Sequence, residues 1–428
     1  MQKITIIGAG PAGLLLAHYL LSRDRFQVEM YDRLDDPRLL ENAGNRTFPL
    51  SLQERGTKAL QGIPGLAEKI ADRATFCTGT MLYSQSGKPR IVKREKPILC
   101  IDRHELVTIL LNELTQNHTG DRLKITFNCC CTEIDAEAKL VTLETENGER
   151  LTTHYELLVG ADGARSRVRE CSVNSTDLNC EQSYALDDYK SLFLNRINSD
   201  ESIALAPDKI HASNIGNQIR ILLVPQPGDR LNGTIIFKRD KNPFENFSTV
   251  AELKAFFQEN FPLFSQLMSS EEAESLFERA IGRIVTVKCD RFHHSNSILL
   301  IGDAAHAVSP SIGQGCNMAL AEAKVVAELS DRHGDNWSQI LAEFSRQQVP
   351  EARALQELSD YCFPRSKWLI LEFFLRLRIR RLLNRWFPQW FKPFLFDLIF
   401  DTDCSYSEIV QDYRFWIDRV KRNTESFQ

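Results

Sequence analysis

Three glycines near the N-terminus have the spacing of a phosphate-binding turn. Gly8, Gly10 and Gly13 form Gly-x-Gly-x-x-Gly between the β-branched run at residues 3–7 and an apolar helical stretch. The first glycine allows a tight turn, the second lets the backbone approach a pyrophosphate, and the third lets helix and strand pack closely. The helix N-terminus would then face the phosphates of a dinucleotide.

An acidic residue follows at the distance that a ribose contact requires. Residues 26–31 alternate as a strand does, and Asp32 ends that strand 19 residues after Gly13. A carboxylate in this place can accept hydrogen bonds from ribose hydroxyls. The full context of strand, turn, helix and acid favours dinucleotide binding over a turn that merely joins a strand to a helix.

A second glycine-rich segment lies far along the chain. The apolar run at residues 297–301 leads into Gly302 and Asp303, and Gly313, Gln314 and Gly315 then open another helix. The second carboxylate and the second helix N-terminus could hold the ribityl chain and the pyrimidine edge of a flavin. The helix dipole favours negative charge that develops on a reduced flavin.

A third turn is open to two interpretations. Asp162 and Gly163 end an apolar strand at residues 155–163, and the next helix carries Arg165, Arg167 and Arg169. These residues could contact the phosphates of a second nucleotide, or they could be a capped helix start with a solvated basic face.

The remaining elements predict two interleaved units and a helical region. The fold class is α/β, with a Rossmann-like FAD-binding domain interleaved with an antiparallel-sheet substrate domain and followed by C-terminal helices. We expect the FAD-binding domain at residues 1–75, 100–180 and 281–340. The substrate sheet is expected at 76–99 and 181–280, and the helical cap at 341–428.

Composition excludes several classes of protein. The 428 residues carry a formal net charge of −5, with 43% hydrophobic and 25% charged residues, which is typical of globular chains and argues against a nucleic-acid partner. The N-terminus lacks a signal-peptide pattern, so we expect a cytoplasmic protein whose 11 cysteines stay reduced. No Cys-x-x-Cys pair occurs, and we expect no metal site.

The three turns, in this order, resemble the class A flavoprotein aromatic monooxygenases that share the para-hydroxybenzoate hydroxylase fold. Within that class the chain is most similar to the kynurenine 3-monooxygenases. The likeness covers most of the chain, including NRTFPLSLQERG, VTVKCDRFHHSNSILLIGDAAHAVSPSIGQG and FSRQQVPEARALQELSDY.

The resemblance implies an FAD site whose residues come from several segments. Those on the adenosine and pyrophosphate side would be Gly8, Gly10, Pro11, Ala12, Gly13, Asp32, Arg33 and Arg46. Arg103 would reach the pyrophosphate or ribityl region, Cys131 would lie near the adenine, and Asp162 would serve both FAD and NADPH. Those on the ribityl and isoalloxazine side would be Gly302, Asp303, Pro310, Gly313, Gln314, Gly315, Cys316, Asn317 and Met318.

The resemblance also implies the reaction. NADPH or NADH would reduce the flavin transiently, and O2 would give a C4a-hydroperoxide that hydroxylates an aromatic or lipophilic ring. No catalytic acid or base is assigned, and His211 and Arg220 are candidate substrate contacts on the sheet. The alternatives are epoxidation or polyprenyl reduction on the same fold, or a flavin-fold protein that binds a partner without catalysis.

The chain departs from the kynurenine enzymes where they hold the substrate carboxylate. Their arginine falls on Thr80, a helping tyrosine falls near Pro97, and an Asn-Tyr pair reads Cys362-Phe363. An amino-acid carboxylate would lack its bidentate partner, which is costly. We therefore expect a larger, less charged aromatic or lipophilic substrate.

The segment at residues 363–400 is both basic and apolar. It holds eight Lys/Arg, two Asp/Glu and three of the five tryptophans. At helical spacing an apolar stripe comprises Trp368, Leu371, Leu375, Ile379, Leu382 and Trp386. The pattern predicts a helical cap over the active site, or peripheral membrane contact through residues 365–396; the two are compatible.

Overall fold

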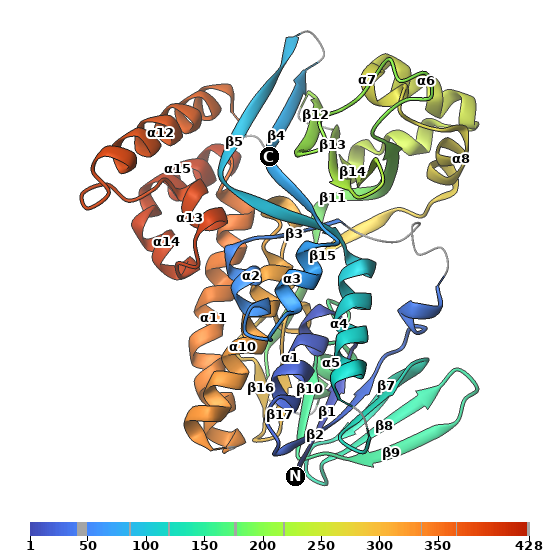
Figure 1. Ribbon diagram of the computed structural model, residues 1–428, viewed down its shortest axis with the longest axis vertical. Coiled ribbons are helices and arrows are strands. Elements are labelled where there is room, and N and C mark those ends of the chain that lie inside the picture. Colours follow the sequence, from blue (N-terminus) through green and yellow to red (C-terminus); the bar gives the residue numbers. More distant parts are fainter. Residues whose placement is uncertain are drawn as a thin grey trace.

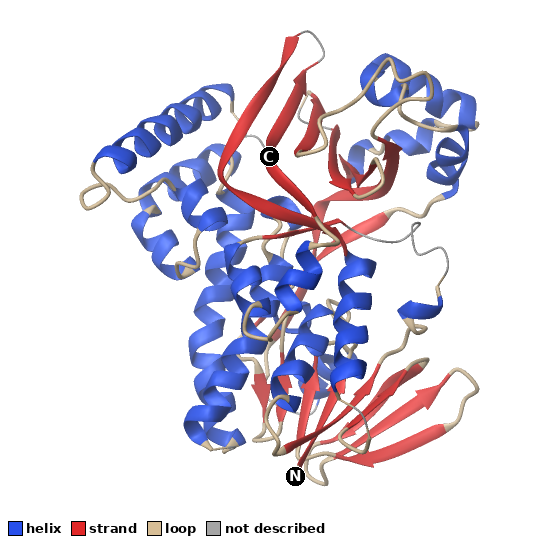
Figure 2. Cartoon of the chain, in the orientation of Figure 1, coloured by secondary structure: helices blue, strands red, loops and turns tan. Residues whose placement is uncertain are grey.

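The computed structural model describes residues 1–40, 49–84, 87–118, 120–174, 178–216, 219–334, 336–364 and 366–425. Two large sheets lie at opposite ends of the molecule, with helices between and beside them (Figures 1 and 2). The predicted mixed α/β class, with an antiparallel sheet and a C-terminal helical region, is confirmed.

The first sheet has six strands and is mostly parallel, in the order β16-β17-β10-β1-β2-β6. Its strands are β1 (Gln2–Ile7), β2 (Phe26–Tyr31), β6 (Leu123–Thr126), β10 (Leu157–Gly160), β16 (His293–His294) and β17 (Ile298–Leu300). The apolar runs predicted as strands near residues 3, 155 and 297 belong to it, and so does the alternating segment predicted as a strand at residues 26–31. Continuous apolar strands of this kind are typical of a parallel sheet covered on both faces.

Helices cover this sheet and carry the turns of interest. They are α1 (Pro11–Leu21), α2 (Glu54–Leu60), α3 (Leu66–Ala71), α4 (Arg103–Asn117), α5 (Arg167–Asn174), α9 (Asp303–His306), α10 (Gly315–His333) and α11 (Trp337–Tyr361). Helix α1 packs against both α10 and α4. A small antiparallel sheet of β7 (Cys129–Asp135), β8 (Leu140–Thr145) and β9 (Arg150–His154) lies beside them (Figure 1).

The second sheet has eight strands in the order β15-β11-β14-β13-β12-β4-β5-β3, and only the β12–β4 pair is parallel. Its strands are β3 (Pro49–Leu52), β4 (Thr75–Ser84), β5 (Gly87–Asp102), β11 (Cys180–Asn195), β12 (Lys209–Ile215), β13 (Ile219–Gln226), β14 (Arg230–Lys238) and β15 (Gly282–Cys289). Helices α6 (Val250–Asn260), α7 (Pro262–Ser265) and α8 (Ser270–Glu278) bury an aromatic-rich core against it.

Strands β3 and β15 belong to the second sheet, although both fall within ranges that we assign to the FAD-binding domain. The division into domains therefore stays a proposal. The expectation that every thiol is reduced is wrong in this structure, because Cys180 of β11 and Cys289 of β15 lie opposite each other and form a disulfide. Cross-strand placement of the two residues was not visible in their sequence separation.

In the part of the chain that the structure describes, four helices follow α11 and form the C-terminal region. They are α12 (Lys367–Trp386), α13 (Leu395–Asp401), α14 (Tyr406–Asp412) and α15 (Arg414–Glu425). Rings of Phe373, Phe394 and Trp416 pack against one another and hold α12 to α13 and α15. Among the described residues, no helix has the length and apolar character needed to span a bilayer.

Candidate functional site

The backbone packs tightly around two glycines of the first turn. Gly8 has a φ of +108°, and a Cβ at this position would overlap the backbone of Ala161. A Cβ on Gly13 would overlap the carbonyl oxygen of Gly8. Only glycine therefore fits at these two positions, as the close packing of strand and helix requires.

Gly10 has open space where a side chain would lie, unlike Gly8 and Gly13. The nearest heavy atom to a Cβ built there is Nη2 of Arg103, at 3.9 Å. Helix α1 begins directly after Gly10, with Pro11 in its first turn and no side chain capping it. Free N–H groups at a helix start, an open glycine and an exposed arginine together suit a pyrophosphate.

Asp32 lies beside this turn at the end of β2. Its carboxylate accepts hydrogen bonds from the N–H groups of Ala9, at 2.6 Å, and Leu34, at 2.8 Å. These bonds fix the carboxylate next to the glycine turn, where a ribose would lie. Arg33 is exposed on the same loop, and Arg46 lies outside the described residues.

The second turn depends on a buried carboxylate of α10. Gly302 has a φ of +59° and a ψ of −142°, and its N–H donates to Oε2 of Glu322 at 2.7 Å. The other oxygen of Glu322 lies 2.6 Å from Nε2 of His306. Burial alone lowers the pKa of His306, but the Glu322 carboxylate outweighs burial, and the pKa is raised. His306 and Glu322 therefore act as a buried pair that holds the turn.

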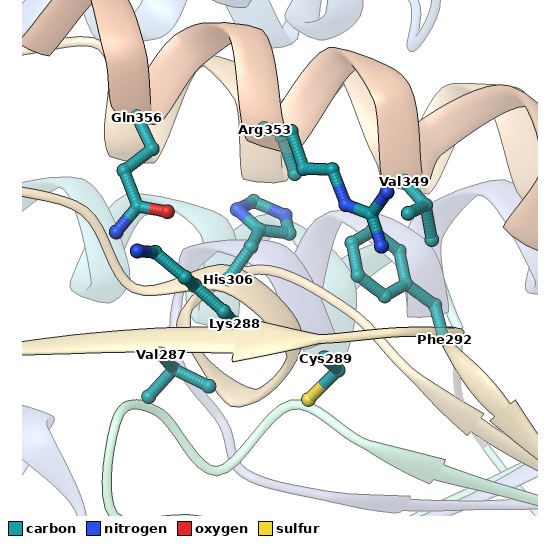
Figure 3. Close-up of a pocket in the computed structure, with 9 residues that line it drawn as sticks. Val287, Lys288, Cys289, Phe292, His306, Val349, Arg353 and Gln356 are labelled. Carbon is teal, nitrogen blue, oxygen red and sulfur yellow. The ribbon is translucent and has the colours of Figure 1, made fainter. Parts of the chain in front are cut away.

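His306 also lines a small pocket between β15 and α11. Figure 3 shows Lys288 and Cys289 of β15 on one side and Arg353 and Gln356 of α11 on the other. Its lining residues include none of the predicted cofactor residues. We therefore treat His306 as a structural residue of the second turn.

Asp303 is exposed in front of the second turn. Its carboxylate makes no hydrogen bond to another described residue, and its Oδ1 lies 3.9 Å from a Cβ built on Gly315. Helix α10 begins at Gly315 without a side-chain cap, so its first N–H groups are also available. A carboxylate beside a free helix N-terminus suits a ribityl chain next to an electron-accepting ring.

The two turns meet in space although about 290 residues separate them. A Cβ built on Gly302 would lie 3.6 Å from the Cβ of Ala12 and 3.0 Å from that of Ala319. Arg103, next to Gly10, is also close enough to Cys316 to lower its pKa, although burial dominates and raises that pKa to about 12. The described residues thus bring both turns to one place.

The side chains of Gln314 and Asn317 point into the protein instead of toward a ring. Gln314 accepts from the Tyr406 hydroxyl at 2.7 Å and donates to Gln53 and to the Ile399 carbonyl. Asn317 accepts from the Gln53 N–H and donates to the Ser51 carbonyl. Gln314 and Asn317 can therefore offer only their backbone to a flavin, beside Pro310 and the left-handed Gly313; Met318 is buried.

Asp162 and Cys131 lie close together behind the first turn. Asp162 caps α5 by accepting from the N–H groups of Arg167 and Val168, which is the structural alternative for this motif. Its other oxygen is buried without a hydrogen-bond partner, and burial raises the pKa of the carboxyl. The Cys131 thiol is buried in β7, so only its backbone could contact an adenine.

The two predicted substrate contacts are engaged elsewhere. His211 is fully buried, and its ring nitrogens lie 2.9 Å from the Tyr83 hydroxyl and 2.9 Å from the Ala206 carbonyl oxygen. Arg220 is exposed and forms an ion pair with Asp187. These contacts argue against a substrate role for either side chain.

Sequence analysis missed two polar residues, Arg94 on β5 and Asp401 at the end of α13. The Arg94 guanidinium stands 4.7 Å from the ring centre of Phe400 and 5.7 Å from that of Phe396, and its Nε and Nη1 have no hydrogen-bond partner. Both carboxylate oxygens of Asp401 are likewise buried and unpartnered, and burial raises the pKa of Asp401 to about 6. The sequence hint was the presence of two acidic residues, four positions apart, in the otherwise apolar segment LFDLIFD.

This polar pair is close to the flavin-side segment. The Ile399 carbonyl, two residues before Asp401, accepts from the Gln314 amide at 2.8 Å. Buried polar atoms normally find hydrogen-bond partners, so this pair is a candidate for contact with a bound molecule.

A family model described as "FAD binding domain" matches residues 1–187 and 256–354. A kynurenine 3-monooxygenase of Sus scrofa is 29% identical over 428 residues, covering 98% of this chain and 88% of that protein. A kynurenine 3-monooxygenase of Legionella pneumophila (strain Corby) is 29% identical over 401 residues, covering 91% and 86%.

Solved structures share the fold at lower identity. The tetrameric form of 2-methyl-3-hydroxypyridine-5-carboxylic acid oxygenase superposes with a TM-score of 0.70 at 21% identity, covering 85% of this chain and 91% of that one. Klebsiella pneumoniae HpxO, in complex with FAD and uric acid, gives a TM-score of 0.68 at 19% identity, covering 90% and 95%.

Proposed function

Because the chain belongs to the FAD binding domain family and is an FAD-dependent monooxygenase, we propose that it uses NADPH or NADH and O2 to hydroxylate an aromatic or lipophilic ring compound. The observation that carries this proposal is the meeting of the two glycine turns, one beside Asp32 and the other beside Asp303. A ligand that contacts both turns would place one end beside Asp32 and the other beside Asp303, as the two halves of FAD could.

The residues at the site fit FAD. Gly10, the start of α1 and Arg103 would hold the pyrophosphate, and Asp32 would hold the adenosine ribose. Asp303 would hold the ribityl chain, and the backbone of residues 313–318 would lie along the ring. Bound FAD supplies the redox chemistry that activates O2, while the chain orients the substrate and excludes water.

The region that would recognise the substrate is more apolar than the resemblance requires. Phe363 packs against Phe373 and Phe396, with ring centres 5.6 and 5.9 Å apart, and Cys362 is buried. Thr80 and Pro97 supply no positive charge. We therefore propose that the substrate is not kynurenine, the compound in the names of the relatives. It is a larger ring with fewer charges.

A compound panel tests this choice of substrate. NADPH oxidation and product mass are measured with aromatic and lipophilic ring compounds, kynurenine among them. We expect a ring compound without an amino-acid group to accelerate oxidation most and to gain one oxygen atom. Kynurenine as the best accelerator would contradict the substrate assignment, and turnover that needs no oxygen would favour reduction on the same fold.

Arg94 is proposed to bind an oxygen substituent on the ring. Replacing Arg94 with Met keeps the stem but removes the unpartnered donors, and a hydrogen bond from a charged group is worth about 1.5–3 kcal/mol. We therefore expect the KM of the best substrate to rise roughly 10- to 100-fold, with FAD content unchanged. Arg90→Met, which removes an exposed arginine of the same strand, should leave KM unchanged.

Asp401 gives this contact a pH dependence. With its pKa near 6, Asp401 is neutral below that pH and negative above it, beside Arg94, Arg381, Lys96 and Asp397. Binding of the ring oxygen to Arg94 should weaken as pH rises through about 6, because the new carboxylate competes with that oxygen for the guanidinium. KM measured against pH should show this rise in the native enzyme and not in Asp401→Asn; identical profiles would exclude the role.

A lipophilic substrate partitions into bilayers. The proposed function therefore includes peripheral membrane contact through residues 365–396 of a protein that works in the cytoplasm.

A further inference from the structure

The apolar stripe of α12 faces away from the protein. The exposed fractions are 82% for Trp368 and 70% for Trp386, and the four residues between them are exposed as well. The opposite face of the helix is the buried one, through Leu369, Phe373 and Leu377. Figure 1 shows α12 at the outer edge of the molecule, beyond α13 and α15. The α12 stripe is therefore not the face that packs as a cap.

The exposed apolar surface continues past the end of the helix. Phe387 is exposed, and Trp390 has an exposed fraction of 82%. An uninterrupted exposed apolar surface of this kind marks an interaction site, since monomeric proteins rarely leave one uncovered. Tryptophan at both ends of the stripe is typical of the boundary between lipid tails and headgroups.

Arginines border the stripe. On a helical wheel, Arg378 and Arg385 lie beside it on one edge, and Arg376 lies near it on the other. Arg378 and Arg385 are exposed and form no ion pair with another described residue, whereas Arg376 pairs with Glu372. Long basic side chains beside an apolar helix face can reach lipid phosphates while the apolar groups enter the bilayer.

We infer that the α12 stripe, with Phe387 and Trp390, binds the surface of a bilayer that contains anionic phospholipids, with α12 lying in the plane of the interface. This inference extends the membrane contact of the proposed function by naming the helix face and the lipid chemistry. Charge favours a lipid partner over a second copy of the chain, because two such arginine-bordered faces would repel each other.

The same helix leads directly to the proposed substrate contact. Arg381 forms an ion pair with Asp397 of α13 and donates to the Lys93 carbonyl of β5 at 3.0 Å. The neighbouring residue of β5 is Arg94, and Asp401 ends α13. A ring compound dissolved in the bilayer would therefore first contact α12, the helix that packs beside Arg94 through Arg381.

Vesicle sedimentation of the FAD-loaded protein tests the inference. The vesicles are phosphatidylcholine alone or phosphatidylcholine mixed with phosphatidylglycerol, at low and high salt. We expect binding to the mixed vesicles, weaker binding at high salt, and little binding to phosphatidylcholine alone.

Two variants separate the contributions. Trp368→Ser/Trp386→Ser/Trp390→Ser should abolish sedimentation, and Arg378→Gln/Arg385→Gln should weaken it roughly 30-fold, since each basic residue near an anionic surface contributes about a factor of five. Leu186→Ser and Arg150→Gln/Arg346→Gln, which change exposed residues on other elements, serve as matched controls and should bind normally.

Equal sedimentation of the tryptophan variant and the native protein would overturn the inference. So would an absence of vesicle binding together with a dimer, seen by analytical ultracentrifugation, that the tryptophan variant loses. Vesicle binding requires no turnover, and hydroxylation is measured without vesicles, so either the inference or the proposed function can fail alone.

Discussion

Asp303→Ala should purify without its yellow colour. In the proposed site, the Asp303 carboxylate would accept hydrogen bonds from the ribityl or ribose hydroxyls, and it makes no hydrogen bond to another described residue. Loss of one hydrogen bond to a charged group costs about 1.5–3 kcal/mol, so the Kd for FAD should rise at least roughly 10- to 100-fold. Absorbance of the purified protein and a fluorescence titration with FAD measure this effect.

The matched control for this variant is Asp24→Ala, which removes a carboxylate that is almost fully exposed and forms an ion pair with Arg122. It should retain full flavin content. A melting temperature of Asp303→Ala equal to that of the native protein stripped of FAD would show that its flavin loss is not a loss of fold, because bound FAD itself raises the melting temperature. Full flavin occupancy in Asp303→Ala would contradict the assignment of this residue.

Glu322→Ala should be the most destabilising single substitution near the site. The Glu322 carboxylate is fully buried and holds both the Gly302 N–H and His306. Removing one member of a buried ion pair costs about 3–5 kcal/mol, because its partner is left unpaired. The second turn should loosen as a result, and flavin should be lost along with stability. Thermal melting with and without added FAD measures both losses.

The pH dependence of stability distinguishes this pair from simple packing. The pKa of His306 is raised in the folded protein, so its protonated form stabilises the fold below the ordinary histidine pKa. That contribution should fade as pH rises through the raised value. Glu322→Gln should lose this dependence, whereas Glu328→Gln, on the exposed side of the same helix, should keep it. Parallel pH profiles for all three proteins would refute the role of the pair.

Local sequence signals were enough to predict the scaffold of the site. The strands before Gly8, Asp162 and Gly302 read as short apolar runs because a parallel sheet buries both of their faces, and the strand before Asp32 was recognised by its alternation. The positions of Gly8 and Gly13 followed from steric demands that only glycine meets. Their meeting with the Gly302 turn followed from the resemblance and not from periodicity.

The direction of individual side chains could not be predicted in the same way. Gln314 and Asn317 fall inside the expected flavin segment, yet their partners Gln53, Ser51 and Tyr406 lie on elements distant in sequence. A helical wheel reveals the stripe on α12 but cannot show which side meets the protein, because both faces carry large apolar residues. Contacts with elements distant in sequence set the direction of these side chains and the buried face of α12.

A crystal structure of the protein purified with its own flavin tests the central claim most directly. The account predicts one FAD per chain, with its adenosine ribose at Asp32, its pyrophosphate between Gly10 and Arg103, and its ring along the backbone that follows Gly313. Side chains filling the space between the two turns, or a flavin bound elsewhere on the chain, would contradict it.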